Sequence, residues 1–321
     1  MSIEFKILWI DDSADYLESL NIDLVGKHIN EQGFKVKFEF RITDEDIDMD
    51  VDGLKYDLIV IDYNLVNDGS KTGASVIRSV REKNCLTEVI FYSAKSISIL
   101  RKVAFDQELE GVFFSSRDAD SLLSKICTVF DLKIKRLIDL DNIRGLVMSG
   151  VADIDMRLTD IIINFNENFI EEHRIKLRKK IVKKMMPGYR DIRDLFVSEH
   201  EEFKNAFNTS LSNFRNLEPK QLEDLVSNRA FSSSRRVETV KSMCQQHIDY
   251  DNKKAILDDI NYLLQWRNAL AHQNPRTIGN ERVFKVGEEE LPFNSIESKK
   301  ILRQLIDLED RLNLLSIVQQ G

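Results

Sequence analysis

"FKILWIDD" (Phe5–Asp12) is a short run of apolar residues that ends in two carboxylates. Four further runs of strand character follow it, with helical spacing between most of them: "FKVKFEF" (Phe34–Phe40), "YDLIVIDYNL" (Tyr56–Leu65), "EVIFYSAK" (Glu88–Lys95) and "GVFFSS" (Gly111–Ser116). Continuous apolar strands that alternate with helices are typical of a parallel sheet covered on both faces. We therefore expect an α/β domain with five parallel strands over residues 1–130. The first helix should cover Asp15–Gly33, with Leu24 on its buried side.

Polar side chains stand at the carboxyl ends of the expected strands, where parallel sheets place their sites. They are Asp11, Asp12, Asp62, Ser93 and Ser116. Three converging carboxylates repel one another unless a cation neutralises them, and their hard oxygen atoms suit Mg²⁺. An aspartate beside Mg²⁺ can act as a nucleophile towards a phosphoryl group. The alternative is that these acids are solvated loop residues or helix N-caps.

The ordered set "ILWIDDS", "DLIVIDYNL", "VIFYSAK" and "GVFFSS" resembles the receiver domain of two-component response regulators, a flavodoxin-like fold. The resemblance implies that Asp11 and Asp12 help Asp62 to bind Mg²⁺ and that Asp62 is the phospho-acceptor. It also implies that the hydroxyl of Ser93 senses the phosphoryl group and that Phe113 is the aromatic switch residue. A histidine kinase or another partner would then act at this domain.

Two features depart from the receiver pattern. Family members carry a lysine after the fifth strand, whereas "FFSSRD" (Phe113–Asp118) places Ser116 or Arg117 there. Arg117 would replace that lysine only if its longer, forked side chain reaches the acceptor aspartate. The loop "VNDGSKTG" (Val66–Gly73) is also longer than usual. Phosphorylation of Asp62 and a receiver kept only for docking or dimerisation are therefore both open.

Composition favours a two-domain protein of 321 residues without a membrane segment. The first 130 residues hold 15 basic and 24 acidic residues, a balance of -9, and the remainder holds 31 and 30, a balance of +1. Cys85, Cys127 and Cys244 are odd in number and lack C-x-x-C spacing, which favours a reducing compartment without disulfides. No basic leader and no apolar run of about 18 residues is present, so we expect a cytoplasmic protein.

The alternation of strands and helices ends near residue 131, and residues 131–321 read as a helical domain, with 131–142 as a linker helix. An apolar stripe at helical spacing begins in this region: Ile143, Leu146, Val147, Ile154, Leu158, Ile161 and Ile162. Further helices are expected over Ser198–Leu217, Leu217–Phe231, Asn252–His272 and Ser295–Val318. "RVFKVGEEELPF" (Arg282–Phe293) predicts a short hairpin, and "FSSSRR" (Phe231–Arg236) is the loosest segment.

"HRIKLRKKIVKKMMPG" (His173–Gly188) is a pronounced basic run. Clustered lysine and arginine attract phosphate backbones, so the run is a candidate RNA-binding surface. The candidate residues are Arg174, Lys176, Arg178, Lys179, Lys180, Lys183 and Lys184. The alternative is an ordinary solvated helix face.

"QWRNALAHQNP" (Gln265–Pro275) places Arg267, Asn268 and His272 near the end of an amphipathic helix. Asn268 and His272 share one helix face, and the forked side chain of Arg267 can swing towards it. A histidine of near-neutral pKa can move the protons of RNA cleavage without a metal, while an arginine stabilises the phosphorane. One copy supplies too few groups, so two copies would have to meet across a two-fold axis.

This segment resembles the HEPN superfamily, whose ribonuclease members carry an arginine, a polar residue and then a histidine. The resemblance covers about residues 140–321, and its specific part is "RNALAH". It implies that Arg267 and His272 are a catalytic pair supported by Asn268, at a homodimer interface, in a toxin or antiviral role. The alternative is a helix end at which His272 interacts with terminal carbonyl groups and Arg267 pairs with an acid.

Together these patterns predict a receiver-regulated, metal-independent RNA endonuclease of the HEPN toxin type, acting as a homodimer in bacterial stress or anti-phage defence. Mg²⁺ would serve the receiver alone, and the receiver state would shift the geometry of the helical dimer. A second hypothesis is a non-catalytic signalling adaptor whose helical domain dimerises or binds RNA without cutting it. A third, a DNA-binding output domain, lacks a helix-turn-helix pattern.

Overall fold

The computed structural model of the chain describes residues 4–42, 55–65, 72–83, 85–167, 170–188, 201–214, 219–245, 247–279 and 281–315. The long loop expected after Asp62 falls largely outside these ranges. Two compact units divide the chain: Ser2–Ile143 with Ser295–Ile306, and Arg144–Asn294 with Asp307–Gly321. None of the described helices is long and apolar enough to cross a membrane.

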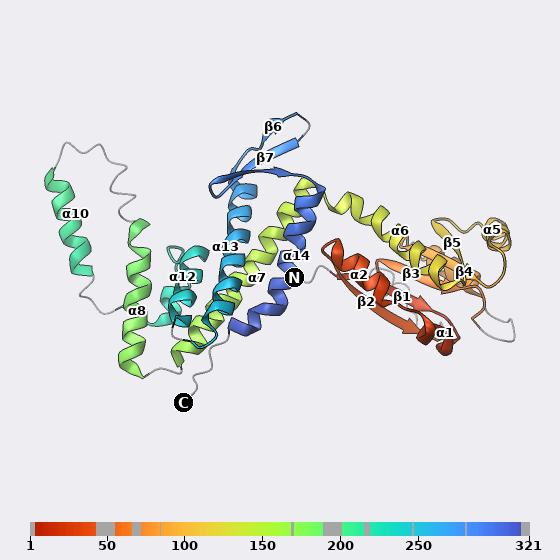
Figure 1. Cartoon of the computed structure of the whole chain (residues 1–321), viewed down its shortest axis with the longest axis horizontal. Coiled ribbons are helices and arrows are strands. Elements are labelled where there is room, and N and C mark those ends of the chain that lie inside the picture. Colours follow the sequence, from red (N-terminus) through yellow and green to blue (C-terminus); the bar gives the residue numbers. More distant parts are fainter. Residues whose placement is uncertain are drawn as a thin grey trace. The chain divides into compact units, whose positions relative to one another are not determined.

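The first unit contains a five-stranded sheet in which every strand pair is parallel. Its strands are β1 (Glu4–Ile10), β2 (Lys35–Arg41), β3 (Leu58–Asp62), β4 (Glu88–Ser93) and β5 (Val112–Ser116). They lie in the order β2-β1-β3-β4-β5 (Figure 1). This is the flavodoxin-like order, so the fold class predicted for the first domain is confirmed. The order reverses between β1 and β3, and ligands bind such sheets at the carboxyl ends beside that reversal.

Helices accompany the sheet in the expected alternation: α1 (Ala14–Ser19), α2 (Asp23–Glu31), α4 (Gly73–Glu82), α5 (Ile97–Asp106) and α6 (Ala119–Leu137). The single helix predicted over Asp15–Gly33 is wrong, because the backbone becomes extended at Leu20 and separates α1 from α2. The break changes the phase of the apolar residues. Leu24 is therefore 54% exposed, while Val25 is buried.

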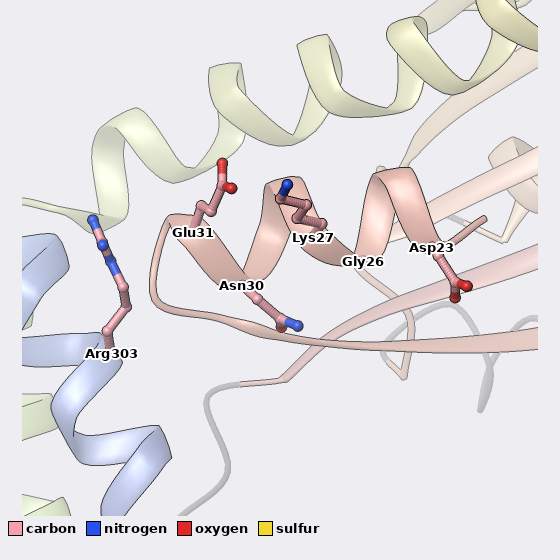
Figure 2. A pocket seen from close by; sticks show the side chains of 6 residues that line it. All are labelled: Asp23, Gly26, Lys27, Asn30, Glu31 and Arg303. Atoms are coloured by element: carbon pink, nitrogen blue, oxygen red, sulfur yellow. The ribbon is translucent and has the colours of Figure 1, made fainter. Parts of the chain in front are cut away.

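The exposed face of α2 carries alternating charges at i,i+4 spacing, Asp23, Lys27 and Glu31 (Figure 2). Opposite charges at this spacing stabilise an isolated helix by about 0.2–0.5 kcal/mol per pair. Because both signs alternate, this face selects neither a cation nor an anion. These three residues line an open pocket together with Gly26, Asn30 and Arg303 (Figure 2).

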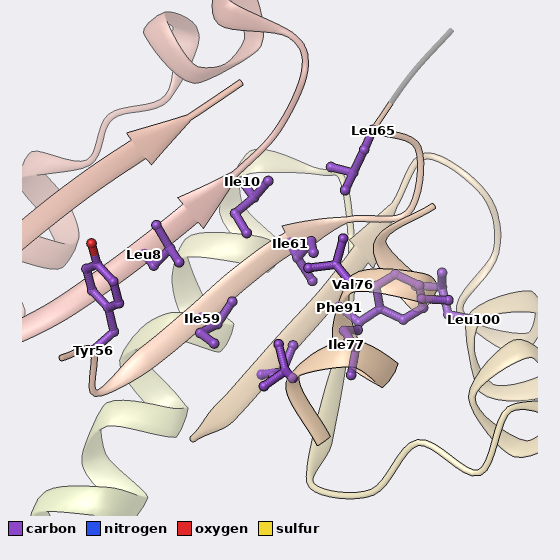
Figure 3. Packing of buried hydrophobic residues seen from close by; sticks show 13 residues of the cluster. Leu8, Ile10, Tyr56, Ile59, Ile61, Leu65, Val76, Ile77, Phe91 and Leu100 are labelled. Atoms are coloured by element: carbon purple, nitrogen blue, oxygen red, sulfur yellow. The ribbon is translucent and has the colours of Figure 1, made fainter. Parts of the chain in front are cut away.

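The core of the first unit places α4 directly against the end of β3. Leu8, Ile59 and Ile61 of the sheet pack with Val76 and Ile77 of α4 in one buried cluster (Figure 3). Gly73 is the first residue of α4, and its backbone lies against the backbone of Asp62, where a side chain does not fit. A Cβ atom at Gly73 would lie 2.1 Å from the carbonyl oxygen of Asp62. The start of α4 thus fixes the position of Asp62.

The remainder of the chain is helix-rich, as predicted. It comprises α7 (Leu140–Glu167), α8 (Glu171–Met185), α10 (Glu201–Phe214), α11 (Leu222–Val226), α12 (Ser233–Cys244), α13 (Tyr250–His272), α14 (Ser295–Arg311) and a 3-10 turn (Leu312–Leu315). Residues 131–142 contain the end of α6 and the start of α7. The prediction that Phe231–Arg236 is the loosest segment is wrong, because most of it forms the start of α12, whose N-cap position is Ser232.

The apolar spacing of this region is confirmed by burial. Ile143, Val147, Ile154, Leu158 and Ile162 of the predicted stripe are all buried. The stripe has helical periodicity, and burying one such face is the main source of helix stability in proteins.

The predicted hairpin is also confirmed, with one more strand than expected. β6 (Arg276–Ile278), β7 (Glu281–Val286) and β8 (Glu289–Phe293) form an antiparallel sheet in that order. Gly287 provides the turn between β7 and β8 with a φ of 63°. Trp266 of α13 packs against Phe284 and Phe293, with ring centroids 6.4 and 6.1 Å away. These contacts fix the hairpin on the end of α13.

Candidate functional site

Three carboxylates meet at the carboxyl ends of β1 and β3. Asp11 and Asp12 follow β1 directly, and Asp62 is the last residue of β3, the neighbouring strand. One carboxylate oxygen from each residue lies within 4.8 Å of the other two. Asp11 and Asp62 are fully buried, while Asp12 is partly exposed. Strand adjacency therefore brings together the three residues that the sequence proposed as ligands.

Hydrogen bonds hold the carboxylate of Asp11 in place. Its Oδ1 accepts a bond of 2.8 Å from the backbone N–H of Ser13. Its Oδ2 accepts the hydroxyl of Tyr92, which in turn accepts a bond of 2.9 Å from Nε1 of Trp9. Burial and the charge of Asp11 raise the pKa of Tyr92, so its hydroxyl stays protonated and serves as a donor. These hydrogen bonds fix the orientation of the Asp11 carboxylate.

Asp62 is less completely satisfied. Its Oδ2 accepts a bond of 3.0 Å from the backbone N–H of Asn64. Its Oδ1 is buried and has no hydrogen-bond partner within the described part of the chain. A buried oxygen without a partner carries a desolvation cost of about 1–3 kcal/mol, which a bound cation or phosphoryl group would relieve. Carboxylate oxygens are the donors that Mg²⁺ prefers, so Asp11, Asp12 and Asp62 fit that ion.

Arg117, which directly follows β5, closes the site. Its Nη2 lies 3.0 Å from Oδ1 of Asp11 and its Nη1 lies 3.4 Å from Oδ2 of Asp62. The side chain of Arg117 therefore reaches Asp62, which was the condition for it to replace the lysine expected after the fifth strand. The guanidinium also lies over the ring of Tyr16, 4.4 Å from its centroid, and the Tyr16 hydroxyl donates a bond of 2.6 Å to the carbonyl oxygen of Arg117.

Ser93 lies at the carboxyl edge of the sheet, whereas Phe113 lies further inside its strand. Ser93 ends β4 and is fully buried, and its Oγ accepts a bond of 3.1 Å from the backbone N–H of Lys95. Its carbonyl oxygen accepts the N–H of Arg117 at 2.9 Å, which ties the ends of β4 and β5 together. Phe113 is half-buried and pairs with Ile90, three residues before the end of β5.

Ionisation of Asp62 should make stability depend on pH. Burial, followed by the charge of Asp11, raises its pKa from 3.8 to about 7, against the opposing effect of Arg117. The folded chain therefore holds this proton more tightly than the unfolded chain. As pH rises between these two values, the free energy of unfolding should fall by up to about 1.4 kcal/mol per pH unit. Below 3.8 both states are protonated, and above about 7 both are ionised.

Urea unfolding of the wild type and of Asp62→Asn in EDTA measures this dependence. The stability of the wild type relative to the variant should decline across the window and level off above it. A relative stability that does not change with pH would contradict a raised pKa for Asp62.

In the second unit, the residues of the R-N-x3-H segment point to different surroundings. Nη2 of Arg267 donates a bond of 3.1 Å to Oγ of Ser233, and Ser233 donates one of 2.5 Å to Asp155. Asn268 and His272 are exposed. Within one chain, Arg267 therefore takes part in a hydrogen-bond network with α7 and α12, and His272 faces solvent.

His272 lines a shallow pocket with Arg144 and Met148 of α7 and with Asn274. Gln273 borders the same pocket, but its side chain is bound to the backbone of Lys285 in β7. The sequence did not identify Arg144 as a neighbour of His272, because the two residues come from helices far apart in the chain.

The basic run forms α8, and its cations divide into two groups. Arg178 is buried and donates to Gln221 and Glu171, each at 3.2 Å. Arg174 donates to the carbonyl oxygen of Glu167, and Lys184 pairs with Glu238. The exposed members of the run are Lys176, Lys179, Lys180 and Lys183. Their i,i+3 and i,i+4 spacing places all four on one face of α8.

Tyr16, Tyr92 and Trp9 were missed in the sequence. Tyr92 directly precedes Ser93 in "EVIFYSAK", and its side chain follows the strand period to the same edge as Asp11. Tyr16 lies four residues after Asp12, one helical turn into the loop and α1. Aromatic residues beside strand-end carboxylates are the signal that could have identified them.

Comparisons with known proteins concern the fold alone. No family model and no curated protein matches the chain. Response regulator DrrB of Thermotoga maritima is 18% identical over 41% of this chain and 54% of that chain, with a TM-score of 0.29. The chain thus spans about half the length of that protein. The receiver domain of a putative LuxO repressor from Vibrio parahaemolyticus is 18% identical over 41% and 92%, with a TM-score of 0.30. A CheY-like receiver domain protein from Methanospirillum hungatei is 16% identical over 41% and 98%, with a TM-score of 0.27.

Proposed function

We propose that the first unit is a phosphoryl-accepting regulatory module and that Asp62 is the acceptor. The observation that carries this proposal is the unpartnered Oδ1 of a buried Asp62, held beside Asp11 and Asp12 at the carboxyl ends of parallel strands. An unpartnered carboxylate oxygen held in one place is what an in-line attack on phosphorus requires. The partner would be a histidine kinase or a small acyl phosphate.

Phosphoryl transfer to Asp62 requires mainly that the negative charges of the site and of the phosphoryl group are neutralised. Oδ1 of Asp62 forms a bond to phosphorus as the bond between phosphorus and the leaving group breaks, which releases the carboxylate of an acyl phosphate or the imidazole of a kinase phosphohistidine. A divalent cation held by Asp11, Asp12 and Asp62 would supply charge neutralisation for the phosphoryl oxygens. The hydroxyl of Tyr92 donates to Asp11 and holds its carboxylate in place. Ser93 is the last residue of β4, the strand beside β3, at the end of the sheet where the phosphoryl group would lie. Asp62 must be ionised to attack, so neutralisation of the site also lowers the cost of that state.

Acetyl phosphate with Mg²⁺ should add one phosphoryl group to the full chain, detected by intact mass spectrometry. Asp62→Asn should abolish the addition, because the amide has no nucleophilic carboxylate oxygen. Asp106→Asn, the same change at an exposed position on α5, should leave it unchanged. EDTA should suppress it in all variants. Equal incorporation by Asp62→Asn and the wild type would refute the proposal.

As a second candidate, we propose that the helical unit cleaves RNA without a metal as a homodimer, with receiver control, in a toxin or antiviral role. The exposed imidazole of His272 and the exposed lysine face of α8 support it, together with the resemblance of "RNALAH" to the HEPN superfamily. The inward bond from Arg267 to Ser233 favours the competing adaptor function, in which this unit dimerises or binds RNA without cutting it. His272 is the residue on which the two alternatives differ most.

A further inference from the structure

One oxygen of the Asp11 carboxylate, Oδ1, has no capacity left for a metal ion. Its Oδ1 accepts both the N–H of Ser13 and the guanidinium of Arg117, and its Oδ2 accepts the hydroxyl of Tyr92. Each carboxylate oxygen offers about two acceptor positions. Oδ1 is therefore full, and a cation that needs it must first displace one of its donors.

Arg117 is the donor that can leave. Ser13 donates from a backbone N–H beside Asp11, and Tyr92 is a buried side chain of β4. Arg117 instead reaches the site from the loop after β5, and its side chain is 23% exposed. It bridges Asp11 and Asp62, so it carries a positive charge into the place where a divalent cation would be attracted.

Tyr16 holds Arg117 in this bridging position. Its ring lies under the guanidinium, and its hydroxyl binds the backbone carbonyl of the same residue. A cation over an aromatic face gains about 0.5–2 kcal/mol, depending on how far it is desolvated. One tyrosine thus fixes both the backbone and the charged end of Arg117.

We propose that Arg117 is a built-in counter-cation that competes with divalent cations for Asp11 and Asp62, and that Tyr16 locks it in place. This inference rests on the proposed cation-assisted acceptor function and adds a control to it. With Arg117 in place the three carboxylates are partly neutralised, so attraction for a divalent cation is weakened. Swinging Arg117 out restores both the acceptor position on Asp11 and the full negative charge of the site.

Isothermal titration of the full chain with MgCl₂ tests the competition without measuring activity. The titration is made at about pH 9, where Asp62 is ionised. Arg117→Met should bind Mg²⁺ at least about tenfold more tightly than the wild type, because a charge repelling the ion is lost. Tyr16→Leu, which frees Arg117 but keeps its charge, should give an intermediate affinity. Arg78→Met, the same change at an exposed arginine paired with Glu82, should match the wild type.

Each outcome decides between the two proposals. Equal or weaker binding by Arg117→Met than by the wild type overturns the competition and leaves the acceptor function intact. Asp12→Asn, added to the wild type and to each variant, should abolish Mg²⁺ binding. That loss locates the ion in this site. No Mg²⁺ binding by the wild type, Tyr16→Leu or Arg117→Met overturns the cation site itself, and the proposed function with it. If Arg117→Met does not fold, Tyr16→Leu alone must bind more tightly than the wild type, or the inference fails.

Discussion

Replacing Gly73 with alanine is expected to destabilise the first unit by about 3 kcal/mol. The new Cβ atom would lie 2.1 Å from the carbonyl oxygen of Asp62 and 3.1 Å from Cε2 of Phe91. A methyl group cannot occupy that space, so either α4 or the end of β3 must move. Because the obstacle is backbone, no side-chain rotation relieves it. Hydrogen-exchange mass spectrometry in urea, read on peptides of β1 and β3, measures the loss.

Gly145→Ala is the matched control for this change. Gly145 lies inside α7, and apart from its chain neighbours and the backbone of that helix, no atom of the described residues lies within 4 Å of the position that its Cβ would take. Alanine should therefore stabilise the helix by about 0.5–1 kcal/mol, because glycine loses more backbone freedom on folding. A Gly73→Ala variant as stable as the wild type would mean that α4 does not press against Asp62. It would also remove the structural reason for the placement of Asp62.

Replacing Arg267 with alanine is expected to destabilise the second unit by about 2–3 kcal/mol. Its guanidinium donates to Ser233 and lies in the network that reaches Asp155, so removal leaves buried polar groups with fewer partners. Arg276→Ala removes an arginine that is 78% exposed and paired with Glu290. That control should change stability by no more than about 0.5 kcal/mol. Hydrogen exchange in peptides of α7 and α13 distinguishes the two variants.

A second pair of variants, Arg267→Ala and His272→Ala, separates a structural role from a part in RNA cleavage. Purified wild type, Arg267→Ala and His272→Ala are incubated with RNA in EDTA. The nuclease candidate requires cleavage by the wild type and its loss in His272→Ala, whose exposed side chain can be removed without destabilising the fold. Equal cleavage by the wild type and His272→Ala would exclude that candidate, because the cleavage would not depend on His272, whereas no cleavage by the wild type would favour the adaptor function. Loss in Arg267→Ala is assigned to cleavage only where hydrogen exchange shows that the variant remains folded, because this substitution also destabilises the unit.

Much of the first unit was predictable because its signals are local. β3 and β4 are continuous apolar runs that end in a polar residue, and β1 is followed directly by one, which marks the carboxyl edge of the sheet. Parallel pairing then brings Asp11 and Asp62 together without further information. The helix over Asp15–Gly33 failed because a three-residue break, Leu20–Ile22, changes the phase of the pattern, and nothing in the propensities of these residues signals it.

The remaining features depend on contacts between distant segments. Arg117 and Asp11 are 106 positions apart, so the bridge between them could be stated only as a condition. The inward bond of Arg267 depends on Ser233, which belongs to a helix whose serine- and arginine-rich start resembles a loop. Polar residues at a helix start are typical of N-caps as well as of loops, and only packing decides between them.

The most direct test of the acceptor function is peptide-resolved mass spectrometry of the wild type after treatment with acetyl phosphate and Mg²⁺. Borohydride trapping converts an aspartyl phosphate into a stable alcohol and so marks its position. The account predicts a single marked residue, Asp62, which disappears in EDTA. A marked residue elsewhere, or no marked residue while the Mg²⁺ site is filled, would contradict it.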